Sequence, residues 1–308
     1  MSKLRQSLKD YLTMRREFGY RLERAASLLG QFVDCCDESG AEFVTVELAL
    51  TWATSPLNCS RRWGANRLGA VRGFARYLHA LDPRHAVAPT NLLPDESHRS
   101  TPYLYSPGEI LALMQATTTI ASPLRAASTS AIIGLLWASG LRVGEALALD
   151  RCDVELARGV LTIRHAKFNK TREVPLHPTS VAALRAYAKR RDELFPRRVS
   201  PAFFVSATGT RVLYRNFHEA FHKLVRRVGI EPRSASCRAR VHDLRHSFTV
   251  SVLTRWYAEG ADVAARLPSL STYLGHANPA ATYWYLSGSP ALLKLAVTRL
   301  EAAYEVAR

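Results

Sequence analysis

The chain has 308 residues, and its 42 Lys plus Arg against 26 Asp plus Glu give a formal net charge of +16 and a pI near 10. Because 47% of the residues are hydrophobic, this surplus indicates a folded protein that meets a polyanion, with nucleic acid as the first candidate and an anionic membrane surface as the alternative. There is no run of about 18 apolar residues and no apolar stretch at the start of the chain, so neither a membrane span nor a signal peptide is expected.

Cysteine usage favours a reducing compartment. The five cysteines are odd in number and lack the pairing of a zinc site; they are Cys35, Cys36, Cys59, Cys152 and Cys237. The adjacent Cys35 and Cys36 fall in a helical pattern and are expected to be small core residues. We therefore expect a cytoplasmic protein, whose length allows two domains.

The first 82 residues are predicted to form a helical domain. Apolar residues recur at intervals of three and four up to Ser39-Gly40, and a short helix is expected from Val46 to Trp52. A third helix is expected from about Ser60 to Leu81, with apolar residues on one side. The other side carries four arginines, Arg61, Arg62, Arg72 and Arg76. A solvated face normally mixes charges of both signs, so this face predicts phosphate contacts.

Residues 83–105 are predicted to be a linker, because four prolines interrupt a polar stretch too long for an ordinary connection. A second domain, 106–308, then opens with Ser106-Pro107-Gly108-Glu109, a capping box with proline at the first helical position. The apolar run 131–137 predicts a buried helix.

The second domain contains one clear β pattern. Alternating residues from Gly159 to Arg164, a break at 165–170 and a second run from Arg172 to Leu176 predict a β-hairpin with a basic turn. A further short strand is expected at 203–205. The remaining candidates are helices at 182–194, 217–228, 244–257 and 290–304. The expected fold is thus mainly α with a small β-hairpin.

Six residues of this domain together form a set that can attack a phosphodiester without a metal ion or other cofactor. They are Arg142, Lys167, His242, Arg245, His276 and Tyr285. Arg142 stands in Ala-Ser-Gly-Leu-Arg-Val-Gly-Glu and Lys167 in Ala-Lys-Phe-Asn-Lys-Thr-Arg-Glu-Val-Pro-Leu. His-Asp-Leu-Arg begins at His242, Leu-Gly-His ends at His276, and Tyr285 follows nine residues later.

These motifs, in this order, resemble the tyrosine recombinases, also called the phage integrase family, and the Xer-type enzymes most of all. The motifs span about 106 to 290, and 1–82 resembles the family in layout alone. The resemblance implies a helical core-binding, DNA-binding domain followed by an α+β catalytic domain. It also implies a site-specific DNA recombinase that works through a 3′-phosphotyrosyl intermediate without metal or ATP.

The resemblance assigns the nucleophile to Tyr285, which would attack the phosphodiester and free a 5′-hydroxyl. Tyr283 is the rival, but two residues on a helix lie about 200° apart, so both cannot face one phosphate. Arg142 and Arg245 match the family's two arginines, which stabilise the negative charge on the phosphate in the transition state. The structural alternatives are a pairing of Arg142 with Glu145, and a surface position for Arg245 near its neighbour Asp243.

By the same resemblance, Lys167 protonates the leaving oxygen, His242 accepts or shuttles the tyrosine proton, and His276 hydrogen-bonds the scissile phosphate. Lys170, three residues after Lys167, is the alternative general acid and a candidate DNA contact. Arg245 and His276 are 31 residues apart, more than in most Xer-type enzymes. This spacing indicates a divergent branch, one that serves a mobile element.

The partners that the resemblance implies are double-stranded DNA with paired half-sites in the bacterial nucleoid, and three further copies of this chain in a synaptic tetramer. The helix at 290–304 would be exchanged between protomers, and a partner recombinase is possible. Two alternatives remain open. A type IB topoisomerase uses similar chemistry, but that family typically has lysine in place of His242. A silent DNA-binding accessory protein would need a broken site.

Overall fold

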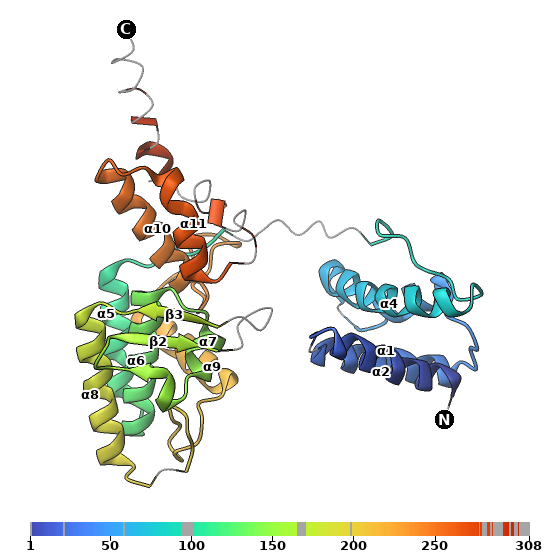
Figure 1. Cartoon of the computed structure of the whole chain (residues 1–308), viewed down its shortest axis with the longest axis horizontal. Coiled ribbons are helices and arrows are strands. Elements are labelled where there is room, and N and C mark those ends of the chain that lie inside the picture. The colour runs from blue at the N-terminus through green and yellow to red at the C-terminus, as the bar shows by residue number, and fades with distance from the viewer. Residues whose placement is uncertain are drawn as a thin grey trace. The chain divides into compact units, whose positions relative to one another are not determined.

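The computed structural model describes most of the chain. The described residues are 2–20, 22–57, 59–93, 101–164, 171–197 and 199–276, followed by 278, 282–283, 285, 292–295, 297–298 and 301. The chain divides into two compact units, Met1–Arg99 and Ser100–Arg308 (Figure 1). The mainly helical, two-part architecture expected from the sequence is confirmed.

The first unit is helical in its described part. Its helices are α1 (Lys3–Glu17), α2 (Glu23–Glu38), α3 (Val46–Thr54) and α4 (Arg61–Leu81). Ser2, Thr45 and Ser60 cap the starts of α1, α3 and α4 with side-chain oxygens that accept backbone N–H groups, which fixes these starts locally. Helices α1, α2 and α4 lie side by side (Figure 1) and enclose an apolar core that includes the fully buried Phe32 and Phe74.

The arginines predicted on one side of α4 have different environments. The exposed ones are Arg61, Arg62 and Arg76. Arg72 instead donates from Nε to the carbonyl of Ala88 (2.8 Å) and from Nη2 to that of Pro89 (2.7 Å). Arg67, which lies off the arginine stripe, is buried over the Trp52 ring at 3.7 Å and donates to the Trp52 carbonyl. Arg67 and Arg72 therefore hold the first unit together.

Parts of the segment expected to be a linker, 83–105, belong to the cores of the two units. Ala88 is buried in the first unit, where Arg72 holds its carbonyl. Tyr103 and Tyr105 are buried in the core of the second unit. The division falls between Arg99 and Ser100. Proline content and polarity predict a linker, but they do not predict that the apolar side chains near its two ends are buried in the neighbouring cores.

The second unit contains helices and one small sheet. Its elements are α5 (Pro107–Ala116), η1 (Thr117–Thr119), α6 (Pro123–Ser139), α7 (Val143–Ala148), η2 (Arg151–Asp153), β1 (Val154–Glu155), β2 (Val160–Ile163), β3 (Arg172–Pro175), α8 (Pro178–Leu194), α9 (Tyr214–Val228), α10 (Asp243–Ala258) and α11 (Val263–Leu274). Helix α6 packs against α5, α8 and α10, and its Ile132, Ile133 and Leu136 are almost fully buried. The buried helix predicted at 131–137 is confirmed, as is the capping box at Ser106.

The sheet is antiparallel with the order β1-β2-β3. Leu161 pairs with Val174 and both are fully buried, so the inward face of the predicted hairpin is confirmed. Strand β1 is an addition to the prediction. The strand expected at 203–205 is wrong: the segment makes only isolated bridges, Asp150 with Ala202 and Val205 with Arg211. The basic turn 165–170 lies outside the described residues.

The long segment between Arg245 and His276 is mostly helical. Helix α10 runs to Ala258, residues 259–262 form the connection, and α11 ends at Leu274. In Figure 1, α10 and α11 lie together at one end of the second unit. Among the described residues, no helix is both long enough and apolar enough to cross a membrane.

Candidate active site

Arg142 lies where α6 ends and α7 begins. Gly140 ends α6 with φ of 61°, and a Cβ on it would be 2.3 Å from the Phe248 ring, so only glycine fits this turn. Arg142 then occupies the position before α7, and its Nη1 donates to Glu145 Oε1 at 2.8 Å. The pairing with Glu145 foreseen as a structural alternative is present. The Arg142 side chain is nevertheless 31% exposed, and its Nη2 donates to the carbonyl of Gly275 at 2.9 Å.

Arg245 lies in the first turn of α10 and is buried. Its Nη1 donates to the carbonyl of Gly140 and its Nη2 to that of Leu274, both at 2.8 Å. Asp243 pairs with Arg240 instead, so the alternative of a surface arginine near Asp243 is wrong. Burial, and next the charge of Arg142, lower the pKa of Arg245 to about 10, which leaves it charged at neutral pH.

A third arginine, Arg172, joins the site and was not predicted. It is the first residue of β3, and its Nη1 and Nη2 donate to the two oxygens of Glu145 at 3.1 and 2.8 Å. Its Nε donates to the carbonyl of Tyr273 at 3.0 Å. A basic residue at the start of the second hairpin strand is the only signal that the sequence offers, because its partners lie 27 and 101 residues away.

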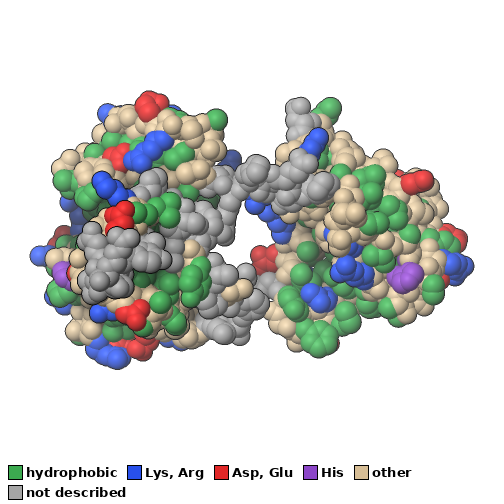
Figure 2. Space-filling model, turned by 90° about the horizontal axis from the view of Figure 1, so that it is seen from above, with side chains coloured by type: hydrophobic (Ala, Val, Ile, Leu, Met, Phe, Trp, Pro, Cys, Tyr) green, Lys and Arg blue, Asp and Glu red, His purple; other side chains and the backbone are tan. Residues whose placement is uncertain are grey.

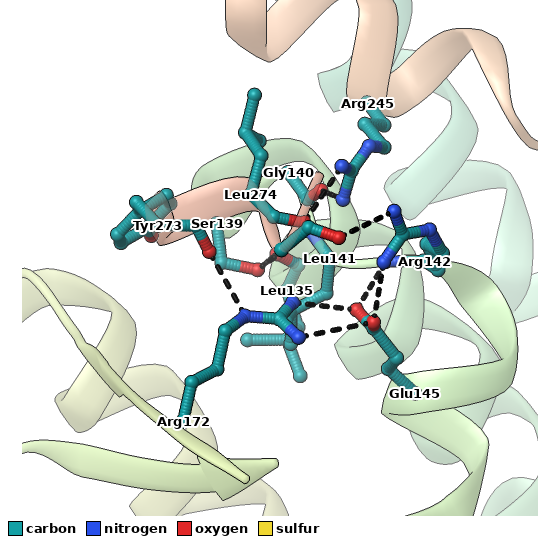
Figure 3. Close-up of polar contacts among 11 residues, drawn as sticks. Leu135, Ser139, Gly140, Leu141, Arg142, Glu145, Arg172, Arg245, Tyr273 and Leu274 are labelled. Atoms are coloured by element: carbon teal, nitrogen blue, oxygen red, sulfur yellow. Dashed lines mark hydrogen bonds and ion pairs between the residues drawn. The ribbon is translucent and has the colours of Figure 1, made fainter. Parts of the chain in front are cut away.

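The C-terminal end of α11 binds all three arginines. The carbonyls of Tyr273, Leu274 and Gly275 accept, in that order, from Arg172, Arg245 and Arg142, which come from β3, α10 and the start of α7 (Figure 3). The last carbonyls of a helix have no partner within the helix and carry the negative end of its dipole. They therefore hold three cations close together that would otherwise repel one another.

His276 and Tyr285 follow this helix end. The His276 Nδ1 lies 2.6 Å from Thr282 Oγ1, and the rings of His276 and Tyr285 stack with centroids 6.2 Å apart and planes 10° apart. Tyr285 is 4% exposed, whereas its rival Tyr283 is 52% exposed. Tyr285 interacts with Arg245, and this interaction counteracts the lowering of the Arg245 pKa. Tyr285 is therefore the tyrosine that faces the arginines.

His242 is exposed immediately before α10, with its ring 4.8 Å from that of His246. The His246 ring in turn lies 5.2 Å from that of Tyr285. His246 and Thr282 were not predicted, although the four-residue spacing from His242 places His246 on the same helix face. Lys167 and Lys170 lie outside the described residues. In the described part of the chain, no three His, Cys, Asp or Glu side chains are grouped so that they could hold a metal ion.

Comparison with known proteins identifies the chain. The family model that matches it, over residues 105–291, is described as the phage integrase family. The chain belongs to this family. The protein y4rB of Sinorhizobium fredii, an integrase/recombinase by name, is 41% identical over 311 residues, which cover 99% of each protein. Tyrosine recombinase XerC of Pelotomaculum thermopropionicum is 31% identical over 231 residues, 72% of this chain and 69% of XerC.

The fold of this phage integrase family member is also found in a solved structure. The Tn1549 transposon integrase, solved in complex with transposon right end DNA, superimposes with a TM-score of 0.66 over 98% of this chain and 99% of that one, at 15% sequence identity. The resemblance inferred from the motifs is confirmed, and the protein is a site-specific tyrosine recombinase.

The recombinase should lose stability in mild acid through His276. Burial, and next the charges of Arg245 and Arg142, lower the pKa of His276 from 6.5 to about 4. Because the pKa of His276 is lower in the folded than in the unfolded protein, His276 favours folding when it is neutral. The stability that neutral His276 contributes is fully present above pH 6.5 and is lost as the pH falls toward 4. Between about pH 7 and 5, wild type should lose about 1 kcal/mol more unfolding free energy than His276→Gln, after allowance for partial exposure. Urea titrations would measure this, and equal pH dependence would contradict it.

Proposed function

We propose that this recombinase breaks DNA by attack of Tyr285 on a phosphodiester, which forms a 3′-phosphotyrosyl bond and frees a 5′-hydroxyl. A 5′-hydroxyl from a partner strand then attacks the phosphotyrosine and releases the tyrosine hydroxyl. The bond energy is kept in the covalent intermediate, so the cycle uses no ATP. The observation that supports this proposal is the burial of Tyr285 against His276, with a hydrogen bond between Tyr285 and Arg245.

Arg142 and Arg245 stabilise the charge on the non-bridging oxygens as the phosphorus becomes five-coordinate. Both are held by carbonyls of the α11 end and of Gly140, so their positions are set before DNA arrives. The Arg142 side chain is the more exposed of the two and makes the first contact with the phosphate. Preorganised cations of this kind cost little reorganisation during the reaction.

The protons are handled by other groups. His242 takes the tyrosine proton, and His276, neutral at pH 7 because of its low pKa, hydrogen-bonds the scissile phosphate. Lys167 protonates the leaving 5′-oxygen, with Lys170 as its rival. The Lys167 assignment rests on the motif alone and is tested by Lys167→Ala against Lys170→Ala, of which only the first should stop cleavage of ordinary DNA.

The decisive experiment uses a nicked suicide duplex built from inverted repeats that flank the gene. Cleavage releases the short strand and traps the covalent adduct, which migrates slowly on a denaturing gel. An adduct that forms in EDTA without ATP, together with strand exchange between two duplexes, supports the proposal. Relaxation of supercoils without exchange would favour the topoisomerase alternative, and DNA binding with no adduct would favour the silent accessory protein.

The substrate that we propose is a mobile element with paired half-sites, acted on in the nucleoid by a homotetramer, with or without a partner recombinase. Similarity over nearly the whole chain to an integrase/recombinase supports the class of reaction. The Tn1549 integrase, of the same fold, was solved on transposon end DNA, which supports double-stranded DNA as the partner and a mobile element as its source.

We propose that exposed α4 arginines contact DNA phosphates. In the space-filling view, the α4 side of the first unit presents Lys and Arg among hydrophobic side chains (Figure 2). Arg76→Gln should weaken DNA binding and reduce the slope of log Kd against log salt by about 1. Arg72→Gln is the matched control: loss of its two carbonyl contacts should lower the stability of the first unit by about 1–2 kcal/mol and leave the salt slope unchanged. An unchanged slope in Arg76→Gln would exclude that contact.

We also propose that the segment 290–304 is exchanged between protomers. Leu292 is 1% exposed and packs in the cluster that contains Tyr285, while Leu293 and Val297 are 49% and 52% exposed. The double variant Leu293→Glu, Val297→Glu should fold and bind one half-site normally but lose cooperative assembly and strand exchange. The size of the protein–DNA complex formed by each protein would measure the loss of assembly. Normal assembly of that variant would exclude these two side chains from the interface.

A further inference from the structure

Arg172, like Arg142, contacts both the Glu145 carboxylate and the end of α11. Its guanidinium spans the two oxygens of Glu145, and its Nε reaches the Tyr273 carbonyl at the end of α11 (Figure 3). The side chains of Arg172 and Glu145 are 12% and 9% exposed, so their ion pair is shielded from solvent. Such a pair is far more sensitive to loss of one partner than a surface pair.

The Glu145 carboxylate is shared between two arginines. Oε1 accepts from Arg142 Nη1 (2.8 Å) and Arg172 Nη1 (3.1 Å), while Oε2 accepts from the Arg142 backbone N–H (3.1 Å) and Arg172 Nη2 (2.8 Å). Burial opposes ionisation of Glu145, but hydrogen bonds and charge from Arg172, followed by those from Arg142, keep its pKa below the ordinary value. Without Arg172, the negative charge of Glu145 would be paired with Arg142 alone and would draw the Arg142 guanidinium toward Glu145.

The approach of Arg172 to α11 also requires a particular residue. A Cβ on Gly275 would lie 2.7 Å from Arg172 Nη1 and 2.8 Å from its Cζ, and Gly275 has φ of +66°. Glycine therefore both ends α11 and admits the guanidinium. The same peptide carries the carbonyl that Arg142 contacts, and the next residue is His276.

We propose that Arg172 is a positioning residue for cleavage: through Glu145 and the α11 end it sets the Arg142 guanidinium toward the scissile phosphate. It does not itself touch DNA in this role. The inference rests on the proposed function, because Arg142 must act on the phosphate charge for its position to affect the rate. A purely structural role would predict instead that any loss in Arg172 variants follows loss of folded protein.

The test uses Arg172→Lys, which keeps a positive charge but cannot span both Glu145 oxygens while reaching the Tyr273 carbonyl. The single-turnover rate of adduct formation is measured on the suicide duplex, with either an ordinary phosphate or a methylphosphonate at the cleavage position. A methylphosphonate lacks one charged non-bridging oxygen, so it needs less stabilisation from Arg142. Thermal unfolding and DNA affinity are measured in parallel.

On ordinary phosphate, Arg172→Lys should cleave about 30- to 100-fold more slowly than wild type, with DNA affinity unchanged within about threefold. On methylphosphonate the difference should shrink to about threefold or less. Glu145→Gln, which keeps the side-chain shape, should show the same contrast. Arg191→Lys is the control, since Arg191 is also buried, donates to a carbonyl (Phe203) and pairs with a carboxylate (Asp192) away from the site. It should reduce stability and leave the rate of folded protein unchanged on both substrates.

If Arg172→Lys slows cleavage equally on the two substrates, or cleaves at the wild-type rate, the inference about Arg172 is overturned and the proposed function is not. If Arg172→Lys does not fold, Glu145→Gln decides by the same contrast. A wild-type protein that forms no adduct would overturn the proposed function, and the inference with it.

Discussion

Replacing Tyr285 by Phe is expected to abolish the covalent protein–DNA adduct while leaving DNA affinity almost unchanged. Phenylalanine keeps the ring that stacks on His276 and lies near His246, and loses only the hydroxyl. Because that hydroxyl is the proposed nucleophile, adduct formation should fall by at least about 10⁴-fold, below detection on a denaturing gel. The unfolding temperature should fall only slightly, since the buried ring is retained and only the hydrogen bond of the hydroxyl with Arg245 is lost.

Tyr283→Phe is the matched control for this experiment. Tyr283 is 52% exposed and lies on the other side of the same short stretch, so its hydroxyl should be dispensable for the chemistry. Wild-type adduct levels are expected from it. An adduct that persists in Tyr285→Phe and disappears in Tyr283→Phe would transfer the nucleophile to Tyr283 and would require a different arrangement of this segment on DNA.

The sequence predicted the elements whose signals are local. The capping box at Ser106, the helix of the apolar run 131–137 and the hairpin at 159–176 depend on neighbouring residues alone, and all are confirmed in the described part. The family motifs name candidate site residues because their order along the chain is characteristic, and these assignments stay predictions; 143 positions separate Arg142 from Tyr285. That the two meet in one site is a property of the fold.

The features that sequence did not predict depend on distant partners. Arg172 is an ordinary strand residue until Glu145 and the Tyr273 carbonyl are brought to it by the fold. Arg72 lies on the predicted basic side of α4, but helical periodicity gives the direction of a side chain and not its partner, which here is the backbone of Ala88 and Pro89. Likewise the segment 203–205, expected to be a strand, takes part only in isolated β-bridges. Its apolar residues reflect burial in the core and not strand pairing.

The arrangement at the end of α11 explains how three arginines are held close together. Each guanidinium gives at least one hydrogen bond to a carbonyl at the negative end of that helix, and Glu145 supplies a full negative charge to two of them. Removal of different arginines should therefore have different consequences. Loss of Arg245, the most buried of the three, should reduce both the stability of the fold and the rate of cleavage.

Arg245→Met is accordingly expected to reduce both stability and cleavage. Methionine fills much of the same volume but cannot donate, so the buried carbonyls of Gly140 and Leu274 lose their partners. The unfolding free energy of the second unit should fall by about 2–4 kcal/mol. Adduct formation per folded molecule should fall by about 10³-fold, because one of the two proposed transition-state cations is gone.

Arg142→Gln separates the two effects. Its side chain is 31% exposed and gives one bond to the Gly275 carbonyl and one to Glu145, which Arg172 still neutralises in the variant. The stability loss should therefore stay below about 1 kcal/mol, while cleavage falls by a similar factor of about 10³. Denaturant titrations of residues 100–308, alongside single-turnover cleavage by the full chain, would measure both quantities. Equal stability losses in the two variants would contradict the structural role assigned to Arg245, whereas unimpaired cleavage in Arg245→Met would remove it from the catalytic set.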